Sequence, residues 1–574
     1  MKTHAVVIVL ILFICACQPT DNAVPTPADR VLLNGAIYTV NPANPWAEAL
    51  AIRGGEISAI GSNAEMRQFI GPDTEKLDLE GRMVMPGIID MHIHPIEGAM
   101  AALYDCSFPF TSTIDEMLEQ VADCVDKAPD GDWIRGGQWP VQLMTGSQSV
   151  NAALLDSVAP DNPVFLIDST VHNAWVNTAA LERLNIDRDT PDPSGGIIFH
   201  DSDGRPTGLL ADDAAYNALS TLPDYSQEQY ESGVAWTVEL LNSFGITGYK
   251  EALSEAGSLN AYSSLDRSGQ LNMRVATSLI WKRSWSQNDE QHRQNIEQRD
   301  SYRTAHVNPD FIKIFLDGIP PTRTAYLLEL YVATAGFDAD FRGNPLHDSA
   351  ALARDVTDFD AAGLTVKMHA VGDGAARQGL DAIEAARKAN GSSGLRHEIS
   401  HAGMIHPDDI DRFAELDAIP EMAPILWYPV PGLAEAQASA VGKERAEHTF
   451  PIRSLVEAGA QPAYGSDWPA VVPTPNPWPG IEAMVTRRNP YLESPQDAKW
   501  EEQAVDLATA IRIFTLNGAR ALKLEDTTGS VEVRKSADLI VLDQNIFEIP
   551  ASDVGNTRVI TTILEGENVY DLPQ

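Results

Sequence analysis

The segment MPGIIDMHIHP, residues 85–95, decides the fold of this 574-residue chain. It is a short apolar run between Gly87 and Pro95, which is typical of a buried strand. The run ends in His92 and His94, and alternate residues of a strand point to the same side, so both imidazoles face one interior and can bind one metal ion. A His-x-His pair alone is weak evidence for a metal, so the rest of the chain has to support it.

Seven further apolar runs are candidate parallel strands like the first. Helical patterns separate most of them, as at residues 355–362 and 375–388, where Leu380, Ile383 and Ala386 fall on one side. Strand and helix in eightfold alternation predict a (β/α)8 barrel, a TIM-like fold whose active site lies at the carboxyl ends of its strands. The predicted strands are residues 87–94, 246–251, 273–281, 311–317, 365–369, 396–401, 419–424 and 462–467.

Both ends of the chain and one long insertion complete the predicted architecture. Short β-rich runs such as VLLNGAIYTV (residues 31–40) predict a small antiparallel sheet, and matching runs near the C-terminus predict that the two ends pair into one β-sandwich. The gap of ~150 residues after the first barrel strand is too long for one crossover helix, so it predicts an inserted subdomain placed to form a lid. The predicted units are a sandwich of residues 29–83 and 525–574 and a barrel of residues 84–524, with the insertion at about 96–235.

Three more side chains with metal-binding chemistry end predicted strands. His369 ends TVKMH, His401 ends RHEISH and Asp467 ends PAYGSD. Any one of them alone would be interpreted as a structural hydrogen-bonding residue, but in a barrel all three converge on the rim that carries His92 and His94. Four histidines and one carboxylate suit zinc or another divalent transition metal.

The order, spacing and flanking residues of these five positions resemble the amidohydrolase superfamily over nearly the whole mature chain. The resemblance extends from AIYTV (36–40) to TLNGARAL (515–522) and GSVEVRKSADLIVLD (529–543). The inserted segments HNAWVN (172–177) and GGIIFHDSDGRPTG (195–208) resemble the family 3 branch, which contains N-substituted formamide deformylase. The resemblance implies a hydrolase whose metal ligands are His92, His94, His369, His401 and Asp467.

The resemblance also implies a fourth-strand lysine that is often carboxylated and bridges two metals. Lys313 in FIKIFLDG (311–318) occupies this place, and burial near a cation would lower its pKa and leave the neutral amine that takes up carbon dioxide. Pairing of Lys313 with Asp317 or another acid is the alternative, and Lys250, which ends the second strand, is a competitor. We therefore expect one or two ions.

Asp467 is the predicted catalytic base and acid. A metal ion of this kind lowers the pKa of water from about 15.7 towards 7 and polarises a carbonyl, which suits cleavage of an amide, N-acyl or N-formyl bond. Asp467 would accept the proton of the attacking water and return it to the leaving amine. His401 or His369 would help to hold the metal or the developing oxyanion.

Three other functions compete with cleavage of a carbon–nitrogen bond. Lactone, ester or carbamate hydrolysis would use the same site. Deaminases of the superfamily resemble one another in a glutamate three residues after the fifth-strand histidine, and this chain has Gly372 there, which disfavours deamination. A non-catalytic binding lipoprotein is disfavoured because every ligand position is filled.

Further residues are predicted to bind a small-molecule substrate. His172 either contacts substrate or forms a structural hydrogen bond to Asp168. Tryptophans in the insertion or near the barrel mouth either line an apolar pocket for an acyl or aryl group or pack in a core; these are Trp139, Trp175, Trp427 and Trp468.

The N-terminus predicts export. Lys2 precedes an apolar run at residues 5–16, which is too short to span a bilayer and has the length of a signal-peptide core. The ICAC sequence at 14–17 resembles a bacterial lipobox, so residues 1–16 are a predicted signal peptide, Cys17 the lipidated residue and 17–28 a polar tether; an ordinary signal with coincidental cysteines is the alternative. Gln18 rather than aspartate points to the periplasmic face of the outer membrane.

Charge and cysteine content limit the remaining choices. A formal charge of -40 would repel nucleic acid, and 44% hydrophobic with 21% charged residues is typical of a globular protein. Cys106 and Cys124 either pair in an oxidising compartment, or Cys124 is a core residue of a helix at 114–125. The membrane is an expected partner only through the lipid, and self-association into a homo-oligomer is left open.

Overall fold

The computed structural model describes residues 26–109, 111–144, 149–282, 289–333, 340–427, 433–470, 472–492 and 497–573. The predicted signal peptide and the lipidated Cys17 lie outside these residues, as does most of the tether. Among the helices that are described, none combines the length and the apolar character that crossing a bilayer requires.

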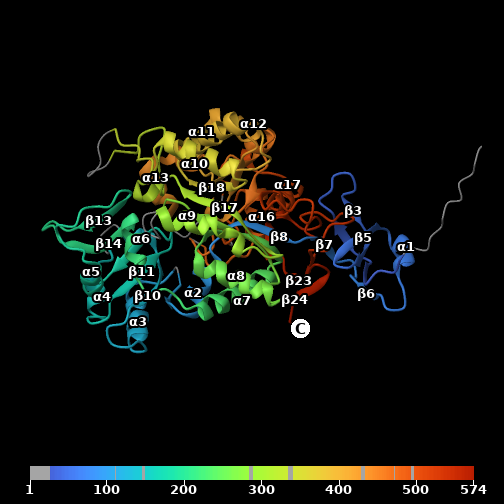
Figure 1. The fold of residues 1–574 in the computed structure, drawn as a ribbon, viewed down its shortest axis with the longest axis horizontal. Coiled ribbons are helices and arrows are strands. Elements are labelled where there is room, and N and C mark those ends of the chain that lie inside the picture. Colours follow the sequence, from blue (N-terminus) through green and yellow to red (C-terminus); the bar gives the residue numbers. More distant parts are fainter. Residues whose placement is uncertain are drawn as a thin grey trace, which may run out of the picture.

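The centre of the molecule is a barrel of eight parallel strands that are hydrogen-bonded in chain order (Figure 1). It closes where the last strand returns to the first: the Asp467 N–H donates to the His92 carbonyl at 2.7 Å, and the His94 N–H donates to the Trp468 carbonyl at 2.8 Å. The predicted barrel is confirmed, and each predicted strand overlaps one of β8 (Ile88–Ile93), β15 (Ile246–Ser254), β16 (Arg274–Ile280), β17 (Val307–Phe315), β18 (Thr365–Ala370), β19 (Glu398–His401), β20 (Ile419–Met422) and β21 (Ala463–Tyr464).

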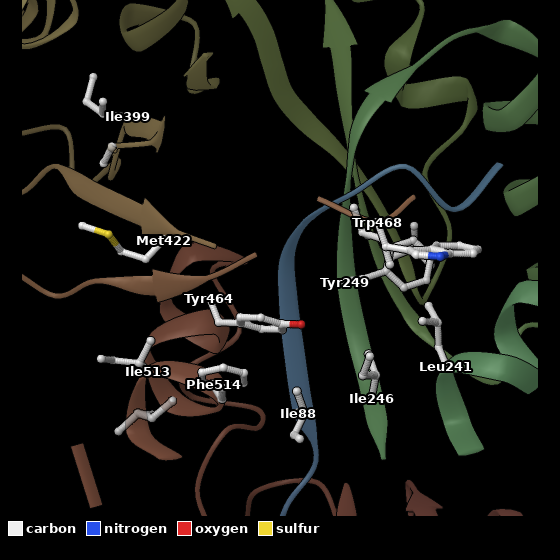
Figure 2. Close-up of a cluster of buried hydrophobic side chains, with 14 of the residues drawn as sticks. Ile88, Leu241, Ile246, Tyr249, Ile399, Met422, Tyr464, Trp468, Ile513 and Phe514 are labelled. Atoms are coloured by element: carbon white, nitrogen blue, oxygen red, sulfur yellow. The ribbon is translucent and has the colours of Figure 1, made fainter. Parts of the chain in front are cut away.

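Amphipathic helices cover the outside of the barrel. In α11 the residues Leu380, Ile383 and Ala386 are buried, and the helix ends at Gly391, whose φ of 76° is left-handed. Figure 2 shows Tyr464 beside Phe514 of α17, and their rings stack with centroids 3.9 Å apart. The helices between and after the strands are α7 (Gln227–Ser243), α8 (Ala256–Arg267), α9 (Asp289–Glu297), α10 (Ser349–Ala361), α11 (Asp373–Asn390), α12 (Ile410–Glu415), α13 (Leu433–Val441), α14 (Lys443–Glu447), α15 (Ile452–Glu457), α16 (Trp478–Thr486), α17 (Leu507–Phe514) and α18 (Leu516–Ala521).

The two ends of the chain form two sheets that share one apolar core. In the six-stranded sheet, ordered β24-β23-β22-β7-β2-β3, the C-terminal β22 pairs with the N-terminal β7. The prediction of a purely antiparallel N-terminal sheet is wrong, because β1 pairs in parallel with β6 and β2 with β7. These strands are β1 (Arg30–Leu33), β2 (Ala36–Tyr38), β3 (Trp46–Ala47), β4 (Ala49–Arg53), β5 (Glu56–Gly61), β6 (Glu75–Asp78), β7 (Met83–Pro86), β22 (Leu539–Leu542), β23 (Val559–Leu564) and β24 (Glu567–Asp571), with α1 (Asn63–Met66) between β5 and β6.

The segment between β8 and β15 folds around a mixed six-stranded sheet of its own, ordered β13-β14-β12-β11-β10-β9. It lies at the opposite end of the molecule from β1–β6 (Figure 1) and connects to the barrel through α2 (Pro95–Leu103) and α7. Its elements are β9 (Cys106–Ser107), α3 (Ile114–Val125), β10 (Ile134–Trp139), α4 (Ala152–Asp156), β11 (Val164–Asp168), β12 (Asn173–Val176), α5 (Thr178–Leu184), β13 (Gly196–His200), β14 (Pro206–Asp212) and α6 (Asp213–Leu219).

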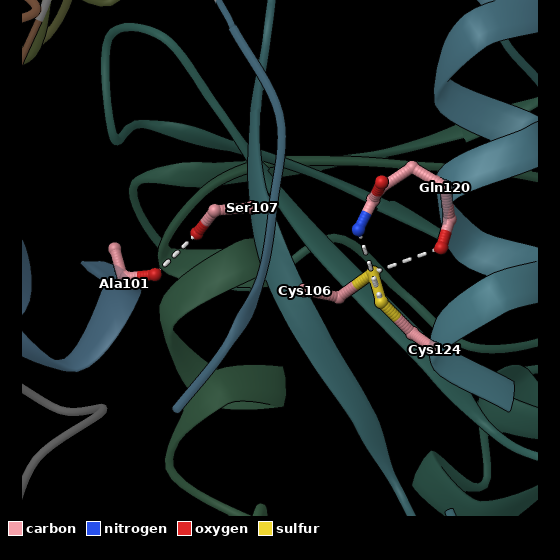
Figure 3. The surroundings of a disulfide bond; sticks show 5 residues. All are labelled: Ala101, Cys106, Ser107, Gln120 and Cys124. Atoms are coloured by element: carbon pink, nitrogen blue, oxygen red, sulfur yellow. Dashed lines mark hydrogen bonds between the residues drawn. A yellow bond between two sulfur atoms is a disulfide. The ribbon is translucent and has the colours of Figure 1, made fainter. Parts of the chain in front are cut away.

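A disulfide links β9 to α3 in this insertion. Cys106 and Cys124 are joined, with Cα atoms 6.0 Å apart (Figure 3). Met117 and Val121 lie on the same helix and are fully buried. The sequence left open whether the two cysteines pair or Cys124 is a core residue, and the structure shows the disulfide.

Candidate metal centre

The five sequence-predicted ligands come together at the carboxyl ends of the barrel strands. Ligand atoms of His92, His401 and Asp467, all three buried, lie within 4.8 Å of one another. Asp467 Oδ1 is 3.4 Å from Nε2 of both His92 and His94. His369 Nδ1 is 2.9 Å from His401 Nε2, which places it next to the group.

Two of these residues have strained backbones. His401 has a φ of 68° and Asp467 a φ of 59°, in the left-handed region that residues with a Cβ rarely adopt. Such conformations cost about 1–3 kcal/mol each and persist where the surroundings enforce them, which is often at functional sites. His401 is the last residue of β19 and Asp467 lies three residues after β21, so the strained backbone occurs where each strand gives way to the loop at the centre.

The donor set fits a metal ion. Nitrogen and oxygen ligands lie about 2.0–2.1 Å from zinc, so neighbouring ligands of a tetrahedral ion are about 3.3 Å apart. The 3.4 Å separations of Asp467 Oδ1 from His92 and His94 match that spacing. Burial lowers the pKa of His401 to about 4 and that of His92 well below its usual value, so both imidazoles are neutral and offer a lone pair. Burial acts to raise the pKa of Asp467, but the surrounding histidines hold it below its usual range, so the carboxylate is ionised.

A buried chain of charges orients His92. Glu421 accepts a hydrogen bond from His92 Nδ1, which fixes the proton there and leaves Nε2 facing the centre. Lys367 Nζ donates to Glu421 at 3.0 Å and to Glu398 at 2.9 Å. Lys250 completes the chain by donating to Glu398. All four charged side chains are fully buried, so the two lysines balance the two glutamates.

Lys313, and not Lys250, lies at the centre. Its Nζ is 3.3 Å from His92 Nε2, and burial, helped by Lys367, lowers its pKa to about 7. Among the described residues, the polar contact of Lys313 Nζ is with His92 Nε2 and not with a carboxylate. The alternative of a pair with Asp317 is wrong, because Asp317 accepts the backbone N–H groups of Tyr326, Val371 and Gly372 at 2.8–3.0 Å.

The insertion contributes His172 to the same cavity. Its Nδ1 is 2.7 Å from Asp212 Oδ1, and its ring centroid is 5.7 Å from that of His369. The expected hydrogen bond to Asp168 exists, but it is made by the backbone N–H of His172 at 3.0 Å. The imidazole therefore remains directed at the cavity, which measures about 540 Å³ and reaches His92, His94, Lys313, His369, His401 and Asp467.

The prediction that tryptophans line this cavity is wrong. Trp139 and Trp175 are fully buried in the core of the insertion, where their indole N–H groups donate to the carbonyls of Leu166 and Asn151. Trp427 and Trp468 border a separate depression, and Trp468 stacks on Trp236 with centroids 6.3 Å apart. The apolar part of the wall of the metal cavity is made instead of aliphatic residues, phenylalanine and tyrosine.

The comparisons with known proteins agree with this geometry. The sequence pattern of the amidohydrolase family matches residues 75–570. The chain belongs to the amidohydrolase family. It is 30% identical over 557 residues to Protein LONG AFTER FAR-RED 3 of Arabidopsis thaliana, covering 95% of this chain and 92% of that protein. It is 29% identical over 557 residues to N-substituted formamide deformylase of Arthrobacter pascens, covering 95% and 98%.

A solved structure shares the fold of this amidohydrolase. An uncharacterized metal-dependent hydrolase from Pyrococcus horikoshii OT3 superposes with a TM-score of 0.69 at 23% identity, covering 91% of this chain and 99% of that one. Family membership makes the chain a hydrolase.

Gly372 leaves no room for the glutamate that the deaminases carry at this place. A Cβ there would lie 2.1 Å from the Tyr326 carbonyl oxygen, which is backbone and cannot give way. This close contact agrees with the sequence-based expectation that deamination is disfavoured.

Three buried charged residues of the chain that orients His92 were not predicted from the sequence: Lys367, Glu398 and Glu421. A weak signal was present for two of them. Lys367 and Glu421 are charged residues within otherwise apolar strands, and Lys367 is two residues before His369 and so on the same side of β18. Asp212, 40 residues after His172, had no such signal.

Proposed function

We propose that this amidohydrolase is a metal-dependent enzyme that cleaves the carbon–nitrogen bond of a small N-acyl or N-formyl compound. The observation that carries the proposal is the convergence of four histidines, one carboxylate and one buried lysine at the end of a cavity of about 540 Å³. The name of the Arthrobacter pascens relative, N-substituted formamide deformylase, supports the choice of bond.

The proposed ligands are the residues whose donor atoms face one another across this end of the cavity: His92, His94, Lys313, His369, His401 and Asp467. Zinc or another divalent transition metal suits this set, and when bound it polarises a carbonyl and makes water a nucleophile near neutral pH. Lys313 lies close enough to His92 to join the set, and its carboxylation would add a bridging group for a second ion.

Asp467 is the proposed general base and acid. It is an ionised carboxylate, and its Oδ1 already lies against His92 and His94 while its Oδ2 is 3.9 Å from His401 Nδ1. From there it accepts a proton from the attacking water and delivers it to the leaving amine. His172, held by Asp212, is placed to form a hydrogen bond with the substrate from the other side.

Asp467→Asn tests this assignment. The variant keeps the shape and an oxygen ligand, so it should retain metal and fold but lose about 10²- to 10⁴-fold in kcat, the usual contribution of general acid–base catalysis. Asp408→Asn, at a carboxylate that is 81% exposed, is the matched control. The substrate panel should contain N-acyl, N-formyl, lactone and carbamate compounds. Normal turnover by Asp467→Asn would place the base elsewhere, and turnover of lactones alone would refute the carbon–nitrogen assignment.

We further propose that the protein is exported and lipid-anchored at Cys17, on the periplasmic face of the outer membrane. The disulfide between Cys106 and Cys124 supports an oxidising compartment. Mass spectrometry of the mature N-terminus should find a lipid on Cys17, and Cys17→Ser should release the protein from the membrane fraction. An unmodified N-terminus at any other residue would contradict the anchor.

A further inference from the structure

Three glutamates line the metal cavity on the side of β15. Glu97 is in the first turn of α2, Glu251 lies within β15 and Glu255 is the N-cap residue of α8. All three face the same cavity as the proposed ligands and none of them is a proposed ligand, although Glu97 Oε1 lies 3.8 Å from His94 Nδ1. The catalytic proposal gives them no task.

The other charged residues of the described lining have partners too, as Glu255 has in the capping box that it forms at the start of α8. Lys313 lies beside His92, and Arg135 stacks over Tyr225 with its guanidinium carbon 4.5 Å from the ring centroid. Asp105 accepts a hydrogen bond from Tyr225 at 2.8 Å, and Asp224 accepts one from Tyr230 at 2.7 Å. Acidic groups outnumber lysine and arginine on the described cavity wall. The lysine and the arginine are Lys313 and Arg135, and the acidic residues are Glu97, Asp105, Asp224, Glu251, Glu255 and Asp467.

Glu251 is the most informative of the three glutamates. It is 2% exposed, it borders the cavity, and its Oε2 has no hydrogen-bond partner. A buried polar atom without a partner costs roughly 1–3 kcal/mol, so its retention calls for an explanation. Burial raises the pKa of Glu251 to about 8, Tyr262 opposes the rise, and the nearby charges of Glu97 and Glu255 add to it. These carboxyl groups are therefore close enough to repel one another, and a positive charge among them would relieve the repulsion.

We infer that the substrate carries a cationic group, an alkylammonium or a guanidinium, at the end remote from the scissile bond, and that Glu97, Glu251 and Glu255 bind it. The inference rests on the proposed function, since it assumes that the scissile bond lies at the metal centre. Ile96, Leu253 and Phe315 line the same cavity and suit an apolar stem. The substrate class is thus a mono-N-acylated diamine or a similar acylated amine with a basic end.

Matched substrates test the inference. The kcat/KM of mono-N-formyl and mono-N-acetyl derivatives of linear diamines is compared with that of neutral alkylamine derivatives of equal length. We expect a preference of about 10- to 100-fold for the cationic compounds, as for a hydrogen bond to a charged group. Glu251→Gln keeps the shape and removes the carboxyl group that a cationic substrate would hold in its ionised form, so the ratio should fall at least tenfold. Glu415→Gln, at an exposed position of α12, should leave the ratio unchanged. Hydrolysis of neutral and cationic compounds at equal rates would overturn the inference while leaving the proposed function intact.

If none of these compounds is hydrolysed, the proposed function is contradicted but the inference of a cation-binding site is not. A direct binding measurement then tests the inference. Calorimetry with the unacylated diamine should show binding to the wild-type protein and at least tenfold weaker binding to Glu251→Gln. Absence of diamine binding, or equal binding by the variant, would overturn the inference. So would metal analysis showing that the glutamates hold a divalent cation that Glu251→Gln loses.

Discussion

Replacing Glu421 with glutamine removes one charge from the buried chain that ends on His92. Glu421 accepts a hydrogen bond from His92 Nδ1 and another from Lys367 Nζ at 3.0 Å, and none of these side chains is more than 1% exposed. In the variant Lys367 keeps Glu398, but Glu398 is already shared with Lys250. The chain is then left with one positive charge in excess in the interior of the barrel.

This excess positive charge sets the size of the expected loss of stability. Removing one partner of a buried ion pair costs roughly 3–5 kcal/mol, because the remaining charge is uncompensated. Hydrogen-bond partners of a metal-bound histidine are worth about 10- to 100-fold in metal affinity. We therefore expect Glu421→Gln to lose about 3 kcal/mol or more of unfolding free energy in the metal-free protein and to bind zinc at least tenfold more weakly.

Two measurements check this expectation. Urea unfolding of metal-free protein gives the stability, and competition with a chelator gives the zinc affinity. The double variant Lys367→Met/Glu421→Gln leaves the neutral pair of Lys250 and Glu398, so it should recover at least half of the lost stability. Wild-type stability and affinity in the single variant, or a double variant less stable than the single one, would refute the role assigned to the buried chain.

Two further predictions concern stability away from the centre. His306 lies 2.7 Å from Asp266 and 3.2 Å from Glu565, which raise its pKa to about 8. The stabilisation by protonated His306 is complete below its unfolded pKa of about 6.5 and is lost as pH rises through about 8, and it is limited to about 2 kcal/mol. The urea concentration at the midpoint of unfolding should decrease as the pH rises from 6 to 9 in the wild type, and much less in His306→Gln. Equal pH profiles of the two proteins would contradict this. Cys124→Ser opens a link with a sequence separation of 18 and should cost on the order of 3 kcal/mol, matching reduced wild type in thermal unfolding. An unchanged unfolding temperature would show that the disulfide does not stabilise the insertion.

The barrel could be predicted because parallel strands covered on both faces leave continuous apolar runs in the sequence. FIKIF within β17 and TVKMHA of β18 are such runs, and a helical pattern follows β18. The direction of pairing at the N-terminus could not be predicted. Whether β1 pairs with a near neighbour or with β6 beyond α1 depends on which faces meet in the shared core, and no local pattern records that.

The candidate site, like the fold, could be predicted only in part. His369 and Asp467 were found because each lies at or near the end of a barrel strand, and the barrel brings strand ends together. Glu421 was missed because one glutamate in a run of four residues has no periodicity. For Trp139 and Trp175 the sequence left pocket lining and core packing open, and core packing is what the structure shows, because the insertion is large enough to bury an apolar core of its own.

The central claim is that His92, His94 and their partners hold a catalytic metal, and metal content measured together with activity tests it most directly. Elemental analysis of the purified protein should find between one and two zinc-like ions per chain. Chelation should abolish hydrolysis of the substrate found in the panel, and added zinc should restore it. His92→Ala should bind at least one ion fewer than wild type. Protein that is metal-free, natively folded and fully active would contradict the account.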